Sequence, residues 1–200
     1  MKTQPLRNHP RRAESMGMPA VQLPEFWTAD MVRALPDDGC RHETVHGELL
    51  VSPAPRVWHE FVVRRLGKAL DQYLERESVG IVMYGRADIS WGPDVLVEPD
   101  LFVAPLAELR TLDWAKVRTL LLVVEVLSPS SARTDRFAKR RLYQEVGIPL
   151  YWIVDADAHH VECWTPDAIT PTTERERLTW HPSGASTPYV IDLEQLFRPL

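Results

Sequence analysis

The sequence VVEVLSPSS, Val123–Ser131, places a carboxylate inside an apolar run. With the residues before it, it forms TLLLVVEVLS, residues 119–128, a pattern typical of a central strand that is covered on both faces. An isolated ionised carboxylate at Glu125 would be very costly there. It therefore needs a positive partner or has to stay protonated, and the sequence predicts that a metal ion or a lysine lies beside it.

The segments around this strand indicate a mixed α/β fold. Apolar residues at intervals of three and four predict a helix over residues 59–78, and a second helix follows the serines and ends at Gly147. The other segments are a hairpin at 41–53 around Gly47, short strands at 81–84, 87–91, 96–103, 150–155 and 160–164, and a last strand or helix at 190–197. This order predicts a central mixed sheet flanked by helices, with an additional N-terminal β-hairpin.

Composition and charge exclude several protein classes. No run of about eighteen apolar residues predicts a membrane span, and Cys40 and Cys163 lack the spacing of a disulfide framework or zinc ribbon, which suits a cytoplasmic protein. We expect a loose tail over residues 1–20 and one domain over residues 21–200. The tail contributes +3 to a net charge of −5, which leaves −8 on the domain. Contact with nucleic acid must therefore be local or pass through metal ions.

Two further residues are candidates to act with Glu125. Asp100 follows Pro99, which cannot donate a ladder hydrogen bond and so favours a bend, and one or two carboxylates with water are typical Mg²⁺ ligands. Lys139 shares the inward stripe of its helix with Tyr143, which predicts that its ammonium meets the carboxylates. Such a set suits metal-assisted hydrolysis of a phosphodiester, in which the lysine orients the attacking water or neutralises charge on the phosphorane.

Each of these residues also has a purely structural interpretation. Buried glutamate–lysine pairs occur as plain ion pairs, and periodicity alone slightly favours that interpretation. Asp100 after a proline can be a turn residue, and His59 can be a surface residue at a helix start. His159–His160 falls in an expected hairpin turn, where solvation is the simpler role. Ser128 lacks a G-x-S-x-G context, and no P-loop or G-x-G-x-x-G occurs.

Several motifs together resemble one known family. They are Pro99–Asp100, EVLSPSS at residues 125–131, Asp135 with Lys139 and Tyr143, GIPLYWIVD at residues 147–155, and HETVHGELLVSPAP at residues 42–55 with His59. The combined string is specific and resembles the Uma family of restriction endonucleases, in the PD-(D/E)XK nuclease superfamily. The resemblance covers the chain from about residue 23 to the C-terminus and implies a restriction-endonuclease-like core.

The resemblance also implies roles for individual residues. Asp100 and Glu125 would bind the metal, and the backbone carbonyl of Val126 would add a ligand. The superfamily places its lysine at position 127, but this chain has Leu127 there. The resemblance assigns that role to Lys139, which the helical stripe also indicates.

Three more residues match family positions that border the site: His59, Glu48 and Tyr143. His46 stands where the family tends to have an acidic residue, so it receives no role. The whole pattern predicts a Mg²⁺- or Mn²⁺-dependent endonuclease that cuts DNA as a homodimer, since a two-fold protein matches a two-fold duplex. The alternative is a non-catalytic nucleic-acid-binding or interaction module with the same fold. A third interpretation is a nuclease for RNA or for damaged or branched DNA, because fold does not determine substrate.

Overall fold

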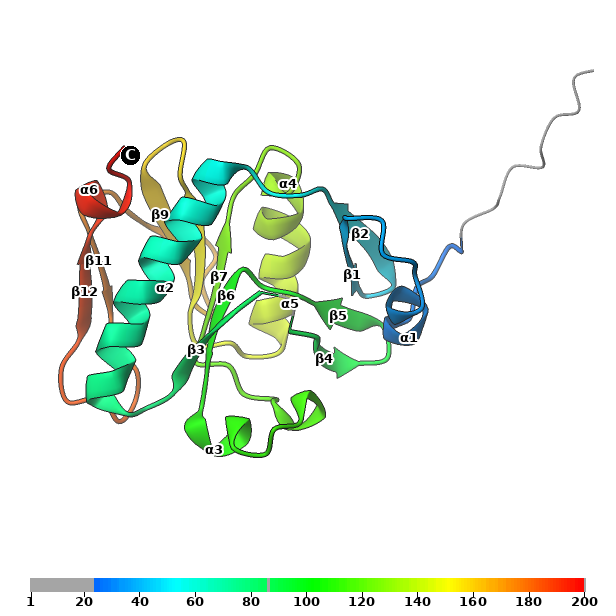
Figure 1. Cartoon of the computed structure of the whole chain (residues 1–200), viewed down its shortest axis with the longest axis horizontal. Helices are drawn as coiled ribbons and strands as arrows, with labels where there is room; N and C mark the ends of the chain where they lie inside the picture. Colours follow the sequence, from blue (N-terminus) through cyan, green and yellow to red (C-terminus); the bar gives the residue numbers. More distant parts are fainter. Residues whose placement is uncertain (1–23, 86, 200) are drawn as a thin grey trace, which may run out of the picture.

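A six-stranded sheet forms the centre of the protein in the computed structural model, which describes residues 24–85 and 87–199 (Figure 1). In spatial order its strands are β10 (Thr172–Glu174), β9 (His160–Trp164), β8 (Tyr151–Asp155), β7 (Leu122–Val126), β6 (Leu101–Ala104) and β3 (Ile81–Tyr84). Strands β7 and β8 run parallel, whereas the other neighbours run antiparallel. The sheet is therefore mixed, which confirms the predicted fold class.

A second sheet carries the N-terminal hairpin. Its order is β2 (Glu48–Ser52), β1 (Arg41–Val45), β5 (Val95–Val97) and β4 (Ile89–Gly92). The predicted hairpin is confirmed, and its turn residues His46 and Gly47 have φ angles of 51° and 81°, as a tight two-residue hairpin requires. A third sheet pairs β11 (Arg177–Trp180) with β12 (Tyr189–Asp192). The sequence analysis did not predict β10 or β11.

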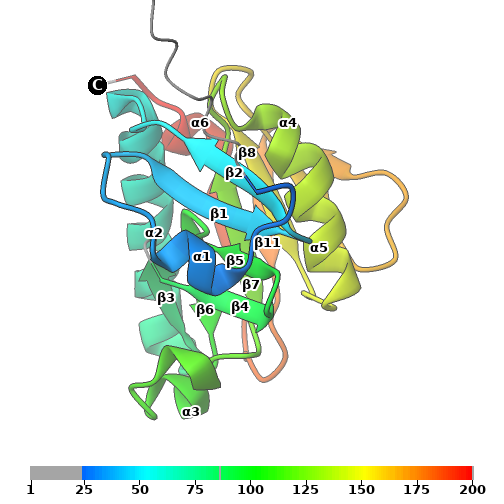
Figure 2. The same cartoon turned by 90° about the vertical axis from the view of Figure 1, so that its right-hand side faces the viewer.

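Helices cover both faces of the central sheet. The helices of the described residues are α1 (Ala29–Arg33), which packs on the four-stranded sheet, and α2 (Val57–Glu77), α3 (Leu106–Leu109), α4 (Ala132–Thr134), α5 (Arg140–Glu145) and α6 (Leu193–Leu196), with a 3₁₀ turn at Trp114–Lys116 and a π-helical segment at Asp135–Lys139. The long helix α2 lies on one side of the sheet, and α4 and α5 lie on the other (Figures 1 and 2). The predicted helix at 59–78 corresponds to α2, and the one that ends at Gly147 corresponds to α4, the π segment and α5 together.

Strand β7 divides its side chains between the two faces, as the pleat of a strand requires. Val124 and Val126 join the apolar cluster beneath α2. Val123 joins the cluster that holds the α5 residues and the inner side of the four-stranded sheet. Glu125 alternates with Val124 and Val126 and so faces the second cluster, where the two larger sheets meet.

Pro99 and Asp100 lie where the chain passes from one sheet to the other. The sequence analysis treated residues 96–103 as one strand interrupted by Pro99, but the structure divides them into β5 of the four-stranded sheet and β6 of the central sheet. A proline has no N–H for the ladder, so pairing ends there. The crossing leaves Asp100 at the start of β6, beside β7.

Two expectations concern segments beyond the sheets. Within the described residues, no helix is long and apolar enough to cross a membrane. The tail expected over residues 1–20 lies outside the residues that the structure describes.

Candidate active site

Five charged side chains are buried together where β1, β6, β7 and the π-helical segment meet. Four are carboxylates and one is an ammonium. They are Glu43 (1% exposed), Asp100 (7%), Glu125 (1%), Asp135 (1%) and Lys139 (2%). Charges are rarely buried unless they are paired or bind a metal, so this cluster is the principal candidate for chemistry.

Lys139 is the centre of the cluster. Its Nζ lies 2.7 Å from Glu43 Oε2 and 3.0 Å from Glu125 Oε1, with Asp135 Oδ1 at 3.7 Å. Burial alone would lower the pKa of Lys139, but these carboxylates raise it, so the side chain stays an ammonium. The Tyr143 hydroxyl donates a 3.3 Å hydrogen bond to the same Glu125 Oε1.

The π-helical segment presents both Asp135 and Lys139 to the interior. Such segments occur frequently at functional sites, because the wider turn re-aims side chains relative to a regular helix. The Tyr151 hydroxyl donates a 3.1 Å hydrogen bond to the carbonyl of Asp135, which ties the segment to β8. Regular helical spacing therefore predicted correctly that Lys139 faces inward, although the backbone that carries it is a π-helical segment rather than a regular α-helix.

Asp100 is held by three donors. Arg41 Nη1 donates to Oδ1 at 3.0 Å, whereas Oδ2 accepts from the backbone N–H of Val126 at 2.8 Å and lies 3.0 Å from His59 Nε2. Burial alone would raise the pKa of Asp100, but the hydrogen bond from His59 and the charge of Arg41 lower it to about 2. Asp100 is therefore ionised at neutral pH, and the backbone of Val126 lies directly beside it.

Glu125 is in the opposite electrostatic situation. Burial raises its pKa well above the ordinary value, Lys139 opposes that rise, and the neighbouring carboxylates of Asp100 and Asp135 add to it. The pKa of Asp135 is raised as well, mainly by burial. The cluster thus has more carboxyl groups than cations, and a proton is favoured on Glu125 and Asp135 unless a further cation lies beside them.

This excess of carboxyl groups suits a divalent cation. Four carboxylates surround two permanently charged cations, Lys139 and Arg41. Among residues 24–85 and 87–199, no group of three or more His, Cys, Asp or Glu side chains is arranged to hold a metal ion. Mg²⁺ nevertheless needs only one or two carboxylates, because water and substrate oxygens complete its octahedral shell. Asp100 and Glu125, which are hard oxygen donors, fit that requirement.

The sequence model of the Uma2 family, described as "Putative restriction endonuclease", matches residues 29–187. The chain belongs to the Uma2 family. Its fold is similar to that in the crystal structure of "a putative nuclease belonging to DUF820" from Anabaena variabilis, with a TM-score of 0.71 and 20% sequence identity. That alignment covers 86% of this chain and 97% of the other. Among curated proteins, none matches the chain.

The structure of this Uma2 protein brings most of the predicted site residues together. Glu125, Lys139 and Tyr143 are in direct contact, and His59 and Val126 contact Asp100. Glu48 is different, because it is exposed at the start of β2 and, within the described part of the chain, its side chain makes no hydrogen bond or ion pair with the cluster.

Leu127 and His46 are the two positions at which the sequence departs from the expected pattern, and the structure of this Uma2 protein shows what each side chain contacts instead. Leu127 follows β7 and packs, half-buried, with the apolar cluster of the α5 side. The ammonium beside Glu125 belongs to Lys139, from the π-helical segment. His46 pairs instead with Glu145, at 2.9 Å.

Two residues of the site were missed by the sequence analysis, and both come from β1. Arg41 binds Asp100, and Glu43 binds Lys139. Their side chains lie two residues apart, so they share a face of the strand with the buried Val45. A charged residue in phase with the buried face of a strand was the signal that could have indicated them.

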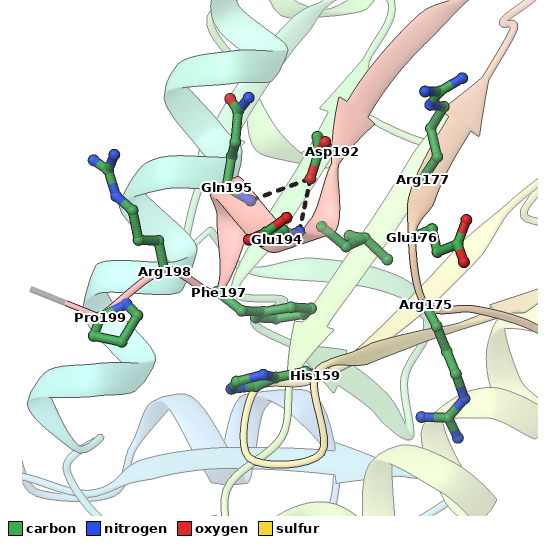
Figure 3. A pocket seen from close by; sticks show the side chains of 11 residues that line it. His159, Arg175, Glu176, Arg177, Asp192, Glu194, Gln195, Phe197, Arg198 and Pro199 are labelled. Carbon is green, nitrogen blue, oxygen red and sulfur yellow. Dashed lines mark hydrogen bonds between the residues drawn. The ribbon is translucent and has the colours of Figure 1, made fainter.

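Access to this Uma2 site is through a modest opening. A cavity of about 360 Å³ is lined by Arg41, His59 and Asp100, together with Pro53 and Tyr84. A larger cavity of about 1010 Å³ lies at the C-terminal end of the chain (Figure 3). None of the five buried charged residues lines it, so this larger cavity and the candidate chemistry are in different places.

Proposed function

We propose that this protein is an endonuclease that hydrolyses DNA phosphodiester bonds with Mg²⁺ or Mn²⁺. The observation that carries the proposal is the buried Lys139 ammonium, 3.0 Å from Glu125 Oε1, in a cluster that holds a second buried carboxylate at Asp100. Membership of the Uma2 family and the similarity in fold to a nuclease support the same chemistry.

Each residue has a definite role in this proposal. Asp100 and Glu125 hold the metal, with the backbone of Val126 beside them. The bound metal supplies an activated water and polarises the scissile phosphate. Lys139 donates hydrogen bonds and neutralises negative charge that develops on the phosphorane. Tyr143, through its hydrogen bond to Glu125 Oε1, orients that carboxylate.

Arg41 and His59 support Asp100 from the side of the opening. Both contact its carboxylate and both line the cavity. They hold the carboxylate ionised and in one orientation, as the groups behind a metal ligand generally do. Since the chain carries a net charge of −5, we expect such local cations and the metal, rather than the overall field, to meet the phosphate.

Duplex cleavage also suggests the assembly. A homodimer would present two such sites, related by a two-fold axis, to the two strands of DNA. The measurement is light scattering of the protein with and without a DNA duplex. A dimer in either condition supports this part of the proposal, and a monomer in both contradicts it without affecting the proposed chemistry.

A second candidate is a non-catalytic module that binds nucleic acid with the same fold. One observation favours it: Asp100 already has three donors on its two oxygens, as a structural carboxylate would. The two functions differ in their need for metal. A module would bind DNA without a divalent ion, and its affinity would survive Glu125→Gln.

The experiment that tests the proposal is calorimetric titration of Mg²⁺ and Mn²⁺ into the wild type and Glu125→Gln, followed by incubation with plasmid and single-stranded DNA. We expect binding to the wild type that is lost in the variant, and nicked or linear plasmid only with the wild type. Glu48→Gln is the matched control, since this glutamate is exposed. A wild type that binds neither metal would overturn the proposal and favour the module.

A further inference from the structure

Both carboxylate oxygens of Glu43 have a partner. Its Oε2 lies 2.7 Å from Lys139 Nζ, whereas its Oε1 accepts a 2.7 Å hydrogen bond from the backbone N–H of Glu98. The residue is 1% exposed and comes from the four-stranded sheet. One side chain thus joins the lysine on the helix to the segment that leads into Asp100.

The same strand fixes that segment a second time. Arg41 donates to the carbonyl of Glu98 at 2.7 Å and to Asp100 Oδ1 at 3.0 Å. Glu43 therefore accepts from the N–H of Glu98, and Arg41 donates to its carbonyl, so both backbone groups of this residue are bound two positions before Asp100. The hairpin sheet is in this way a structural part of the site rather than a separate appendage.

The position of the Lys139 ammonium depends on competition between carboxylates. It lies nearer to Glu43 than to Glu125, at 2.7 Å against 3.0 Å. In a buried environment such attractions are strong, because little solvent screens them. Without the charge of Glu43, the ammonium would pair with Glu125 alone, and its full positive charge would oppose a divalent ion at that carboxylate.

We propose that Glu43 is a positioning residue of the nuclease site, which acts through Lys139. It takes the shorter of the two contacts to the ammonium, so that Lys139 is shared between two carboxylates rather than paired with Glu125 alone, and Glu125 can still bind a divalent ion. This inference rests on the proposed function and extends it to the four-stranded sheet.

The first test is Glu43→Gln, which keeps the shape and the acceptor for Glu98 but removes the charge. We expect Mg²⁺ affinity and kcat each to fall about 10- to 100-fold, the usual range for groups that orient metal ligands, with KM for DNA nearly unchanged. Glu43→Asp restores the charge and should recover part of both losses. The matched control is Glu48→Gln, on the other strand of the hairpin, which should behave as the wild type.

A second test separates this role from a merely structural one. If Glu43 acts through Lys139, then Lys139→Met and the double variant Glu43→Gln/Lys139→Met should bind Mg²⁺ with equal affinity. A further loss in the double variant would overturn the inference. The comparison also stands if Glu43→Gln alone fails to fold, because the double variant leaves no unpaired buried charge at this pair.

The outcomes distinguish the two proposals. A wild type that neither binds metal nor cuts DNA contradicts the proposed function, and the inference with it. A wild type that does both, with Glu43→Gln equal to it in Mg²⁺ affinity and kcat, contradicts only the role of Glu43. A Glu43→Asp variant that is folded and weaker than Glu43→Gln would also contradict it, because charge would then not be the property that matters.

Discussion

The buried charge cluster and the C-terminal cavity differ in both burial and volume. The cluster packs five ionisable side chains into the junction of two sheets, beside an opening of about 360 Å³. The cavity holds about 1010 Å³ and is open, with the exposed Arg175, Arg177 and Arg198 spread around it (Figure 3). Within the described residues, the side chains of these arginines form no ion pair.

The polar groups of the cavity mostly serve the fold. Asp192 caps α6 by accepting from the N–H groups of Glu194 and Gln195 at 2.8 and 3.3 Å. The His159 ring stacks on Phe197, with centroids 5.2 Å apart and 7° between the planes. Solvent screens exposed charges, whereas burial strengthens every attraction in the cluster. The comparison teaches that desolvated pairing, rather than volume, indicates where chemistry can occur.

The largest effect should come from Lys139→Ala. We expect kcat for plasmid cleavage to fall by about 10²- to 10³-fold, as for other single donors to a charged transition state, while Mg²⁺ binding is retained. Lys68→Ala, at an exposed position of α2, should leave kcat unchanged. An unfolded Lys139→Ala with no effect of metal on the wild type would instead make the cluster a structural ion-pair network and would remove the contrast with the cavity.

Metal addition should stabilise the wild type. At 100 times Kd, a ligand that binds only the folded state adds about 2.7 kcal/mol, or roughly 5–10 °C in Tm for a chain of this size. Asp100→Asn should abolish the increase, because it removes a metal ligand. Thermal melts with Mg²⁺ and with chelator measure both. A double variant Glu176→Gln/Glu194→Gln, which removes two carboxylates that line the cavity, should keep the full increase, and its loss there would place the metal in the cavity.

Arg41→Met should cost stability in a pH-dependent way. The variant leaves a buried Asp100 oxygen without its cation, at about 1–3 kcal/mol. Because the folded-state pKa of Asp100 is about 2 against an ordinary 3.8, its stabilising contribution is present above pH 4 or so and is lost as the pH falls toward 2. Denaturant unfolding should therefore show the largest difference from wild type near pH 7 and a small one near pH 2. A difference that grows toward acid would contradict the ion pair.

The smallest effect should come from the cavity itself. Arg175→Ala combined with Arg177→Ala should change the free energy of unfolding by less than about 0.5 kcal/mol, as exposed substitutions usually do. Plasmid cleavage should also continue at the wild-type rate. A clear loss of cleavage with intact folding would show that the cavity takes part in substrate binding, and the contrast would then be one between a catalytic and a binding region.

Local patterns were sufficient for the elements that frame the site. The apolar run around Glu125 predicted β7, helical spacing predicted α2, and Gly47 marked the hairpin turn. Such features depend on residues that are close along the chain, because the spacing of apolar residues and the choice of turn residues determine local secondary structure. The pairing of Glu125 with Lys139 was also predictable, because strand and helix are consecutive and the helix returns over its own strand.

Long-range partners could not be predicted in the same way. Glu43 precedes Lys139 by nearly a hundred residues and lies in the four-stranded sheet. No local sequence pattern shows that this strand packs against that helical segment. The division of residues 96–103 between two sheets has the same origin, since a proline predicts a break but not the destination of the chain. Nor could spacing reveal the π-helical segment, whose irregular turn depends on what Asp135 and Lys139 contact.

The amino-acid sequence alone therefore determined the elements, the burial of Glu125 and its need for a cation, because apolar periodicity and the cost of an isolated buried charge are local quantities. Only the tertiary structure decided which groups meet that need. It brought Arg41 and Glu43 from β1 to Asp100 and Lys139. The physical reason is that buried charges are balanced by whatever the packing of distant elements places within a few ångströms, and that packing is a property of the whole fold.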